Sequence, residues 1–254
     1  MKLLGKVCIV TGGGAGIGAA IAARCASEGA IVAIWESDHN AGQTVAADVG
    51  GSAHSCDVSL RADVQRACDE TLAAHGRVDV LVNNAGIALA GPSECVTDDE
   101  WNRSIAVMQT GVFLCSQIVG RQLLAQRSGA IVNVSSINAS EAFPMRLAYG
   151  AAKAAVVAMT EVLAIEWADR GVRVNSVAPG VTRTALVDRA VRDGIVDIER
   201  YERRTPMQRF AEPDEIARAV VFLASAEDAS FITGETLRVD GGWSAQGWIT
   251  EEKQ

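Results

Sequence analysis

The sequence predicts an α/β fold in which a doubly wound, parallel sheet of seven strands carries helices on both faces. Short apolar runs rich in β-branched residues recur along the 254 residues, and longer helical patterns lie between them. Strands of a parallel sheet are buried on both faces, so they need continuous apolar runs of this kind. The length and the 49% hydrophobic content allow a fully developed core. We therefore expect a single domain over 1–254.

The predicted elements alternate along the chain. The strands are expected at 6–12, 30–36, 52–58, 78–86, 129–136, 172–180 and 235–242. The helices are expected at 16–28, 59–75, 98–127, 149–169 and 213–225. Thr97 is suited to cap the helix that starts at 98, and Pro213 with its following acids is typical of a helix start. The connection 181–212 is charged, rich in Arg and long, which predicts a lid over a functional site.

Composition and charge exclude several classes of partner. The net charge of −8 argues against nucleic acid, because such binding depends on clustered Lys and Arg. The six cysteines form no C-x-x-C pair and the three histidines have no ligand spacing, so we predict no metal. The apolar run 7–23 contains too many glycines for a membrane span, and no export signal is evident. We expect a cytoplasmic protein with no membrane partner.

A glycine-rich stretch, "TGGGAGIG" at 11–18, follows the first strand and opens the first helix. Free backbone N–H groups and the positive helix end at such a place bind a pyrophosphate. The stretch fits T-G-x-x-x-G-x-G, whereas a turn that merely packs strand on helix would explain only two of the glycines. We therefore predict a Rossmann-type dinucleotide site. Its loop contacts are expected from Gly12, Gly14, Ala15, Gly16, Ile17 and Gly18.

Glu36, twenty residues after Gly16, stands at the end of the second predicted strand. A carboxylate there can accept hydrogen bonds from the adenosine ribose and repel a 2′-phosphate. Ala15 occupies a place where an Arg or Lys would bind that phosphate. Both residues favour NAD over NADP, although Ser37 or Asp38 could share the ribose contact and Glu36 could instead be a solvated carboxylate.

Six motifs in order carry a resemblance to a known family. They are "TGGGAGIG" (11–18), "CDV" (56–58), "NNAG" (83–86), "VNVSS" (132–136), "YGAAK" (149–153) and "VAPGVTRT" (177–184). With them the chain resembles the short-chain dehydrogenase/reductase family over essentially its whole length. The resemblance implies an NAD-dependent oxidoreductase that interconverts a secondary alcohol and a ketone. It also implies that Asp57 and Val58 flank the adenine, that Asn84 contacts the adenosine ribose side through its backbone, and that Thr182 and Thr184 hold the nicotinamide carboxamide.

The same resemblance assigns the chemistry to Ser136, Tyr149 and Lys153. Tyr149 and Lys153 lie one helical turn apart on one face, and a cation beside a phenol stabilises phenolate against its usual pKa near 10. The resemblance makes Tyr149 the acid/base, Lys153 the cation that also holds the nicotinamide ribose, and Ser136 the partner of the substrate oxygen. Ser135 competes with Ser136, and the spacing of thirteen residues to Tyr149 favours Ser136. A buried Tyr with a snorkelling Lys is the alternative.

One residue of the family pattern is missing, because Met108 stands where an Asn usually anchors water that relays protons to the lysine. A thioether cannot donate a hydrogen bond. Gln109 or Ser104 could replace the Asn, backbone carbonyls could hold the water alone, or the enzyme could be slow. Ser104 lies one turn back on the same face, whereas Gln109 points about 100° away. We expect a working enzyme in which Met108→Asn preserves or raises turnover.

The substrate is expected over Tyr149, between 87–95, 137–147 and the lid. Asn138 and Arg146 suggest a polar alcohol such as a sugar, polyol or hydroxy acid, although a surface Arg is common. The uncharged helix 104–120 is typical of an oligomer interface, and the resemblance implies a homotetramer. Two alternatives remain open: an NADP-dependent carbonyl reductase, and a dinucleotide-sensing binding protein with weak catalysis, which only Met108 favours.

Overall fold

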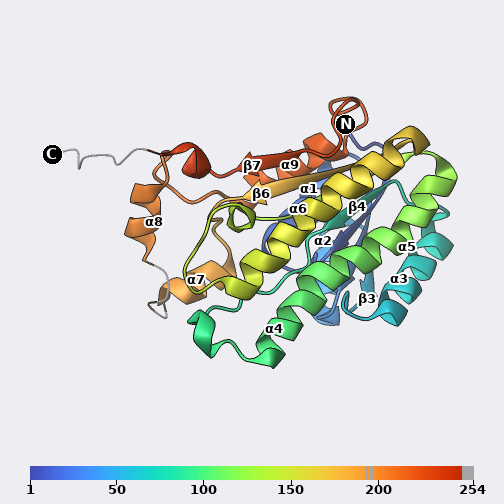
Figure 1. Cartoon of the computed structure of the whole chain (residues 1–254). Coiled ribbons are helices and arrows are strands. Elements are labelled where there is room, and N and C mark those ends of the chain that lie inside the picture. Colours follow the sequence, from blue (N-terminus) through green and yellow to red (C-terminus); the bar gives the residue numbers. More distant parts are fainter. Residues whose placement is uncertain (193, 195–196, 248–254) are drawn as a thin grey trace.

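The computed structural model describes residues 1–192, 194 and 197–247, in which strands and helices alternate around one sheet (Figure 1). The strands are β1 (Val7–Thr11), β2 (Ile31–Glu36), β3 (Ser52–Ser55), β4 (Val80–Asn83), β5 (Gly129–Val134), β6 (Val172–Pro179) and β7 (Thr236–Val239). They form a seven-stranded sheet in the order β3-β2-β1-β4-β5-β6-β7, and every neighbouring pair is parallel. The predicted fold class is confirmed. Each predicted strand also included end residues that turn into the loops at the sheet edge.

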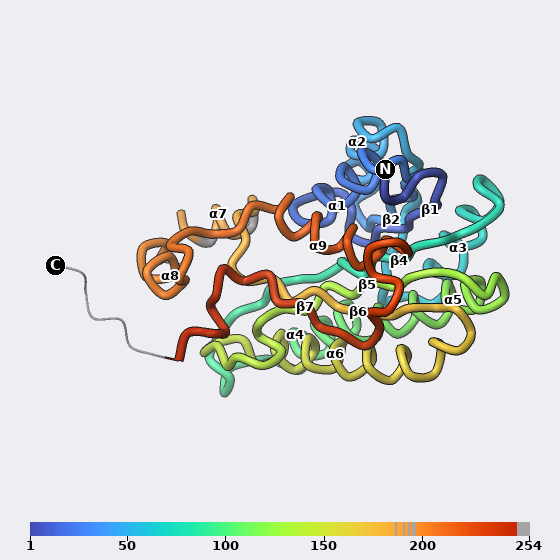
Figure 2. The backbone as a smooth tube through the Cα atoms, turned by 90° about the horizontal axis from the view of Figure 1, so that it is seen from above, coloured from blue at the N-terminus to red at the C-terminus, as the bar shows by residue number. Residues whose placement is uncertain are grey.

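Helices cover both faces of the sheet, as the view from above shows (Figure 2). On one face lie α1 (Gly16–Ser27), α2 (His39–Val49) and α9 (Pro213–Ala224), whose apolar residues join one core cluster. On the other face lie α3 (Arg61–His75), α5 (Gly111–Gln126) and α6 (Leu147–Trp167), which join a second cluster. In addition, α4 (Asp98–Ile105) runs into α5 and packs against α6.

The helices differ from the prediction in three places. The helix expected at 98–127 is interrupted by a π-helical turn, Ala106–Thr110, between α4 and α5. Helix α2 was not among the predicted helices, although Asp38 caps it by accepting from the N–H groups of Asn40 and Ala41. The long connection 181–212 contains α7 (Ala185–Arg192) and α8 (Ile198–Arg204).

The strand order reverses between β1 and β4, and a crevice forms where such neighbouring strands diverge. Thr11, the last residue of β1, joins the two strand ends. Its Oγ1 accepts from the N–H groups of Asn84 (3.0 Å) and Ala85 (3.1 Å). The Asn84 side chain donates in turn to the carbonyls of Thr11 and Gly12, both at 3.0 Å. The glycine loop is therefore fastened to the end of β4.

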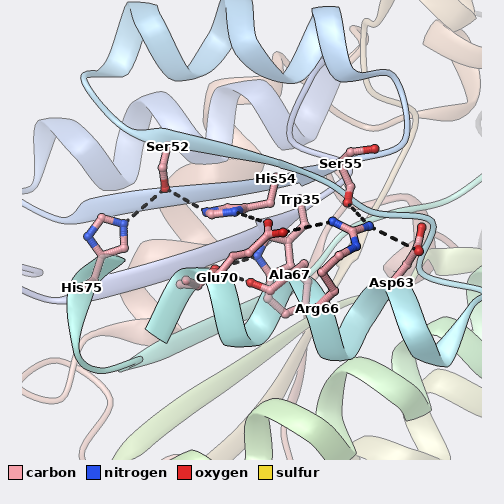
Figure 3. Close-up of polar contacts among 10 residues, drawn as sticks. Trp35, Ser52, His54, Ser55, Asp63, Arg66, Ala67, Glu70 and His75 are labelled. Carbon is pink, nitrogen blue, oxygen red and sulfur yellow. Dashed lines mark hydrogen bonds and ion pairs between the residues drawn. The ribbon is translucent and has the colours of Figure 1, made fainter. Parts of the chain in front are cut away.

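Polar contacts hold α3 against the edge strand β3 (Figure 3). Ser52 Oγ lies 3.2 Å from Nε2 of both His54 and His75, and His54 Nδ1 lies 3.0 Å from Glu70 Oε2. The hydrogen bond from His54 is the main cause that lowers the pKa of Glu70. Arg66 also donates to the Ser55 carbonyl at 2.9 Å. Of these contacts, the one from Arg66 satisfies a backbone carbonyl of this edge strand, and the others join its side chains to α3.

One helix of the described residues, Leu147–Arg170, is long and apolar enough, by length and composition alone, to cross a bilayer. Core helices of globular proteins pass the same test, so this is weak evidence for a membrane. The helix packs on β6 and α4, and its residues Tyr149 and Lys153 line the cleft described below.

Candidate active site

A cleft of about 670 Å³ is lined by loops that follow the strands and by the start of α1. All but one of the residues that the sequence suggested for cofactor, substrate or catalysis line it. They are Gly12, Ala15, Gly16, Ile17, Gly18, Glu36, Asp57, Val58, Asn84, Ser136, Asn138, Arg146, Tyr149, Lys153, Thr182 and Thr184. The exception is Gly14, whose N–H donates to Glu36 Oε2 at 3.1 Å. Segments far apart in the chain therefore meet in one cleft.

Two glycines of the loop, Gly12 and Gly18, lie too close to neighbouring backbone to carry a side chain. Gly12 has a φ of +63°, and a Cβ there would lie 2.8 Å from Ala85 Cα. A Cβ on Gly18 would overlap the Gly12 carbonyl oxygen. Helix α1 starts at the extended N-cap Ala15 with no side-chain cap and no acid in its first turn. The helix start therefore presents backbone N–H groups and a positive dipole end to the cleft, which suits a pyrophosphate.

Glu36 is held rigidly at the end of β2. Its Oε2 accepts from Gly14 N–H, and its Oε1 accepts from Ser37 Oγ and Asp38 N–H, each at 3.1 Å. The Asp38 carboxylate is occupied at the N-terminus of α2, where it accepts from Asn40 and Ala41 at 3.1 Å. Of the two carboxylates, Glu36 is thus the one whose side chain borders the cleft.

The remaining cofactor candidates shape the two ends of the cleft. Asp57 Oδ1 accepts from the N–H (2.9 Å) and the hydroxyl (2.6 Å) of Ser59, which fixes the turn after β3. At the other end, Thr182 Oγ1 donates to the Gly180 carbonyl at 3.1 Å, and Thr184 Oγ1 accepts from Val187 N–H at 3.3 Å. These contacts fix the start of the connection that leads to α7.

Lys153 is almost completely buried, with 4% of its surface exposed. Its Nζ donates to the Val134 carbonyl at 2.7 Å and lies 5.7 Å from the centroid of the Tyr149 ring. Burial lowers the pKa of Lys153 to about 8. Burial also raises the pKa of Tyr149, opposed first by the hydrogen bond with Ser136 and then by the charge of Arg146. Ser136 and Arg146 are therefore the two residues that lower the pKa of Tyr149 and so favour its phenolate.

The two neighbouring serines after β5 differ in their contacts. Ser135 Oγ donates to the Val177 carbonyl and accepts from Ser176 Oγ, both at 2.8 Å, so its hydroxyl joins β5 to β6. Ser136 Oγ accepts from Asn138 N–H at 3.1 Å, and Ser136 is also the first residue that lowers the pKa of Tyr149. The geometry therefore favours Ser136, as the spacing did.

Met108 lies in the π-helical turn, is fully buried, and does not line the cleft. Its Cγ and Sδ lie 3.7 and 3.8 Å from where a Cβ on Gly86 would stand. Ser104 is also buried, its hydroxyl has no hydrogen-bond partner, and it lines a second, smaller pocket. Lys153 Nζ already donates a hydrogen bond to a backbone group, the Val134 carbonyl. Ser104, by contrast, does not border the cleft. Interrupted helical turns of this kind are frequent at functional sites.

An aromatic stack that was not predicted from the sequence forms one wall of the cleft. The Phe143 and Trp243 rings stack at 5.3 Å, and Tyr201 of α8 lies 5.9 Å from Trp243. The Arg204 guanidinium lies 4.6 Å from the centroid of the Trp243 ring. Phe143 and Tyr201 border the cleft. No motif or spacing in the sequence pointed to Tyr201.

The thiols and histidines offer no obvious metal centre in the described part of the chain. All six cysteines, which the structure describes, are unpaired thiols, and only Cys95 is exposed. No three or more His, Cys, Asp or Glu side chains gather as ligands among the described residues. That the protein needs no metal stays a prediction.

The parallel sheet, its switch point and the glycine loop define a Rossmann-type dinucleotide-binding protein. Residues 12–244 match the family model described as enoyl-(acyl carrier protein) reductase. The chain belongs to the short-chain dehydrogenase/reductase family, as its six motifs indicated.

Several similar proteins that match over nearly their full length are named as dehydrogenases of polyols or diols. D-threitol dehydrogenase of Mycolicibacterium smegmatis is 43% identical over 248 residues, which are 96% of this chain and 94% of the relative. 2,5-dichloro-2,5-cyclohexadiene-1,4-diol dehydrogenase of Sphingobium indicum is 40% identical, covering 96% of this chain and 98% of the relative. The structure of NAD⁺-bound xylitol dehydrogenase has a TM-score of 0.89 at 32% identity, covering 95% of this chain and 100% of that one. These likenesses identify an oxidoreductase that acts on CH–OH groups, which confirms the predicted class of reaction.

Proposed function

We propose that this protein is an NAD-dependent dehydrogenase that interconverts a polar secondary alcohol, a polyol in particular, and the corresponding ketone. The observation that carries the proposal is the meeting of Ser136, Tyr149 and Lys153 in the same cleft as the glycine loop and Glu36. Bound NAD⁺ would accept the hydride. The chain itself supplies the groups that orient the alcohol and take its proton.

The preference for NAD rests on Glu36. Three hydrogen bonds hold its carboxylate at the edge of the cleft, where it can accept from the ribose hydroxyls. A 2′-phosphate beside that carboxylate would bring two negative charges together, and Ala15 offers no compensating cation. The similar xylitol dehydrogenase binds NAD⁺ in its crystal structure, which is consistent with this preference.

We assign the proton chemistry to Tyr149. Before the alcohol binds, the Ser136 hydroxyl favours the Tyr149 phenolate; with the alcohol bound, its single proton would be donated to the substrate oxygen instead. Lys153 is proposed to hold the nicotinamide ribose and to supply a buried positive charge, since its Nζ already lies over the Tyr149 ring. With Met108 out of the cleft, the Val134 carbonyl holds Lys153 Nζ in place, and water would have to exchange protons with it.

A polyol suits the polar side of the cleft. Asn138 and Arg146 both border it, and the charge of Arg146 is close enough to lower the pKa of Tyr149. Two of the similar proteins are named for D-threitol and xylitol. We therefore place polyols ahead of hydroxy acids and sugars as substrates.

The connection 181–212 is proposed as the substrate lid. Its base is pinned because Arg183 N–H donates to the Ala211 carbonyl (2.8 Å) and Ala211 N–H to the Val181 carbonyl (3.0 Å). Between these points Tyr201 reaches the cleft and stacks near Trp243. Residues 193 and 195–196 of this connection lie outside the described residues.

A cytoplasmic homotetramer formed by a single domain, 1–254, remains our proposal for the assembly. Most apolar residues of 104–120 face the protein's own core, so that helix is explained in part by burial. Exposed apolar side chains that could form an interface include Val162 (53% exposed) and Ile165 (82%) of α6 and, within 104–120 itself, Phe113 (45%). Light scattering after gel filtration would measure the mass of the assembly. Ile165→Glu should lower that mass, because it places a charge on the exposed apolar surface of α6.

The test is a panel of secondary alcohols and polyols offered with NAD or NADP, followed by the absorbance of the reduced nicotinamide. Turnover of polyols with NAD, lost in Tyr149→Phe, is the expected result. Better turnover with NADP would favour the carbonyl reductase alternative. Binding of dinucleotide without turnover of any alcohol would favour the binding protein.

A further inference from the structure

The C-terminal segment 243–246 packs against helix α8 of the connection 181–212 (Figure 1). Its tryptophan contacts aromatic rings from two of the walls expected around the substrate. The Trp243 ring stacks on Phe143, with centroids 5.3 Å apart and planes inclined by 21°. It also stacks on Tyr201 of α8, at 5.9 Å and 26°. Trp243 is not among the described residues that line the cleft, but it joins two that do.

Arg204 of α8 fastens this C-terminal segment. Its guanidinium carbon lies 4.6 Å from the centroid of the Trp243 ring, which is close enough for a cation–π interaction. Its Nη1 donates to the Trp243 carbonyl at 3.1 Å and to Gln246 Oε1 at 3.3 Å, and its Nη2 donates to the Gln246 carbonyl at 3.3 Å. The planar guanidinium spreads these donors over two nitrogens, whereas the ammonium of a lysine is a single point of charge. Arg204 therefore binds both ends of the segment.

The contacts of Arg204 differ from those of other arginines nearby. Arg203 Nη1 lies 3.4 Å from Glu199 Oε2, and Arg209 Nη1 lies 2.7 Å from Glu215 Oε2. These two arginines form ion pairs with exposed or half-exposed carboxylates, which contribute little in water. Arg204 is half-buried and directs its guanidinium to a ring, two carbonyls and an amide of another segment. Its contacts therefore join two parts of the chain rather than decorate one helix.

The turn before Trp243 is also in direct contact with the end of α8. Thr205 is 5% exposed, and its Oγ1 donates to the Tyr201 carbonyl at 2.9 Å. Met207 N–H donates to the Gly241 carbonyl at 3.1 Å. A Cβ on Gly241 would lie 2.8 Å from Thr205 Cγ2, so the two segments approach closely. Helix α8 therefore cannot move away from the cleft without breaking its contacts with the C-terminal segment.

We propose that Arg204 is a positioning residue for substrate binding, and that it acts through Trp243. The clamp on Trp243 keeps the rings of Phe143 and Tyr201 together, and so holds α8 over the part of the cleft where the substrate is expected. Loss of the clamp moves a wall of the substrate site and leaves the glycine loop unchanged. The inference rests on the proposed function, in which 181–212 is the lid, and it names the residue that keeps this lid in place.

The first experiment measures kcat and KM for NAD and for the polyol that the wild type oxidises best. Arg204→Gln removes the charge and one of the two nitrogen donors, so the KM for the polyol should rise about tenfold, while kcat and the KM for NAD stay unchanged. Arg204→Lys keeps a cation near Trp243 and should raise the KM for the polyol by a smaller factor. Arg203→Gln is the matched control, because the Arg203 side chain lies next in the same helix and is 68% exposed.

A double variant tests whether the two residues act as one unit. Trp243→Leu should raise the KM for the polyol about as much as Arg204→Gln does. The double variant should then be no worse than the weaker of the two single variants, because each change already releases the same clamp. Effects that multiply would show independent roles and would overturn the proposal. A wild-type KM in both Arg204→Gln and Arg204→Lys, or equal rises in KM for NAD and the polyol, would also overturn it.

Tryptic digestion tests the clamp without relying on turnover. Cleavage after Arg200 of α8, followed by mass spectrometry, should be about tenfold faster in Arg204→Gln than in the wild type or in Arg203→Gln, because it depends on the population of the opened helix. An unchanged rate would overturn the clamp. If the wild type oxidises no alcohol with either dinucleotide, the proposed function is wrong, and the role in substrate binding falls with it. If the wild type oxidises polyols but Arg204→Gln leaves the KM unchanged, this inference alone is overturned.

Discussion

Replacing Lys153 by Met should make the protein more stable near neutral pH while removing the cation from the site. Burial lowers the pKa of Lys153 from 10.5 to about 8, because the ammonium loses its water and gains only the Val134 carbonyl. A pKa difference of about 2.5 is equivalent to about 3 kcal/mol of destabilisation while the group is charged in both states. Met fills a similar volume without charge. Loss of the hydrogen bond to Val134 would offset about 1 kcal/mol of the gain.

The sign of the pH dependence follows from proton binding. Below pH 8 the folded and unfolded chains both hold the Lys153 proton, and the full penalty applies. Between about pH 8 and 10.5 the unfolded chain binds more protons, so the wild type gains stability relative to the variant. The advantage of Lys153→Met should therefore shrink by about 3 kcal/mol between pH 7 and 10.5.

Urea unfolding followed by circular dichroism at the two pH values measures this difference. Lys6→Met is the matched control, because the Lys6 side chain is 42% exposed and escapes comparable desolvation. A stability difference between wild type and Lys153→Met that is the same at pH 7 and 10.5 would refute the reasoning.

Three further predictions concern the cofactor loop and the π-helical turn. Glu36→Gln keeps the size of the side chain and removes a repulsion of about 4 kcal/mol per charge pair at 4 Å, so kcat/KM for NADP relative to NAD should rise about 100-fold or more. An unchanged ratio would contradict this role. Gly18→Ala puts a Cβ onto the Gly12 carbonyl and should weaken NADH binding at least tenfold by fluorescence titration, whereas Gly247→Ala, in open space, should not. Met108→Asn should keep or raise kcat but lower the free energy of unfolding by about 1–3 kcal/mol, because position 108 is fully buried; a large loss of kcat with intact folding would count against the alignment.

Much of the fold followed from local patterns. The apolar strands of a parallel sheet are visible in the sequence because burial on both faces demands uninterrupted Val, Ile and Leu. The π-helical turn at Ala106–Thr110 was not visible, since its residues have the same apolar character as the helices on either side. Helix α2 was missed because its residues, His39–Val49, are only moderately apolar and just two of them are buried.

The candidate site was predictable where a backbone constraint leaves a mark on the sequence. Gly12 and Gly18 are glycines because any Cβ would strike Ala85 or the Gly12 carbonyl. The spacing of Tyr149 and Lys153 reflects one turn of α6. The aromatic stack of Phe143, Tyr201 and Trp243 left no such mark, because its three members come from separate segments with no shared spacing.

By itself, the sequence determined the class of fold, the family and most of the candidate cofactor and catalytic residues at the cleft, since these depend on periodicity, glycine positions and short motifs. Only the tertiary structure decided what each polar group contacts. It showed that Ser135 joins two strands while Ser136 reaches Tyr149, and that Asp38 caps a helix while Glu36 faces the cleft. It also placed Ser104 outside the cleft, with its hydroxyl buried. The physical reason is that hydrogen-bond partners and burial arise from segments far apart in the chain, whose meeting no local pattern records.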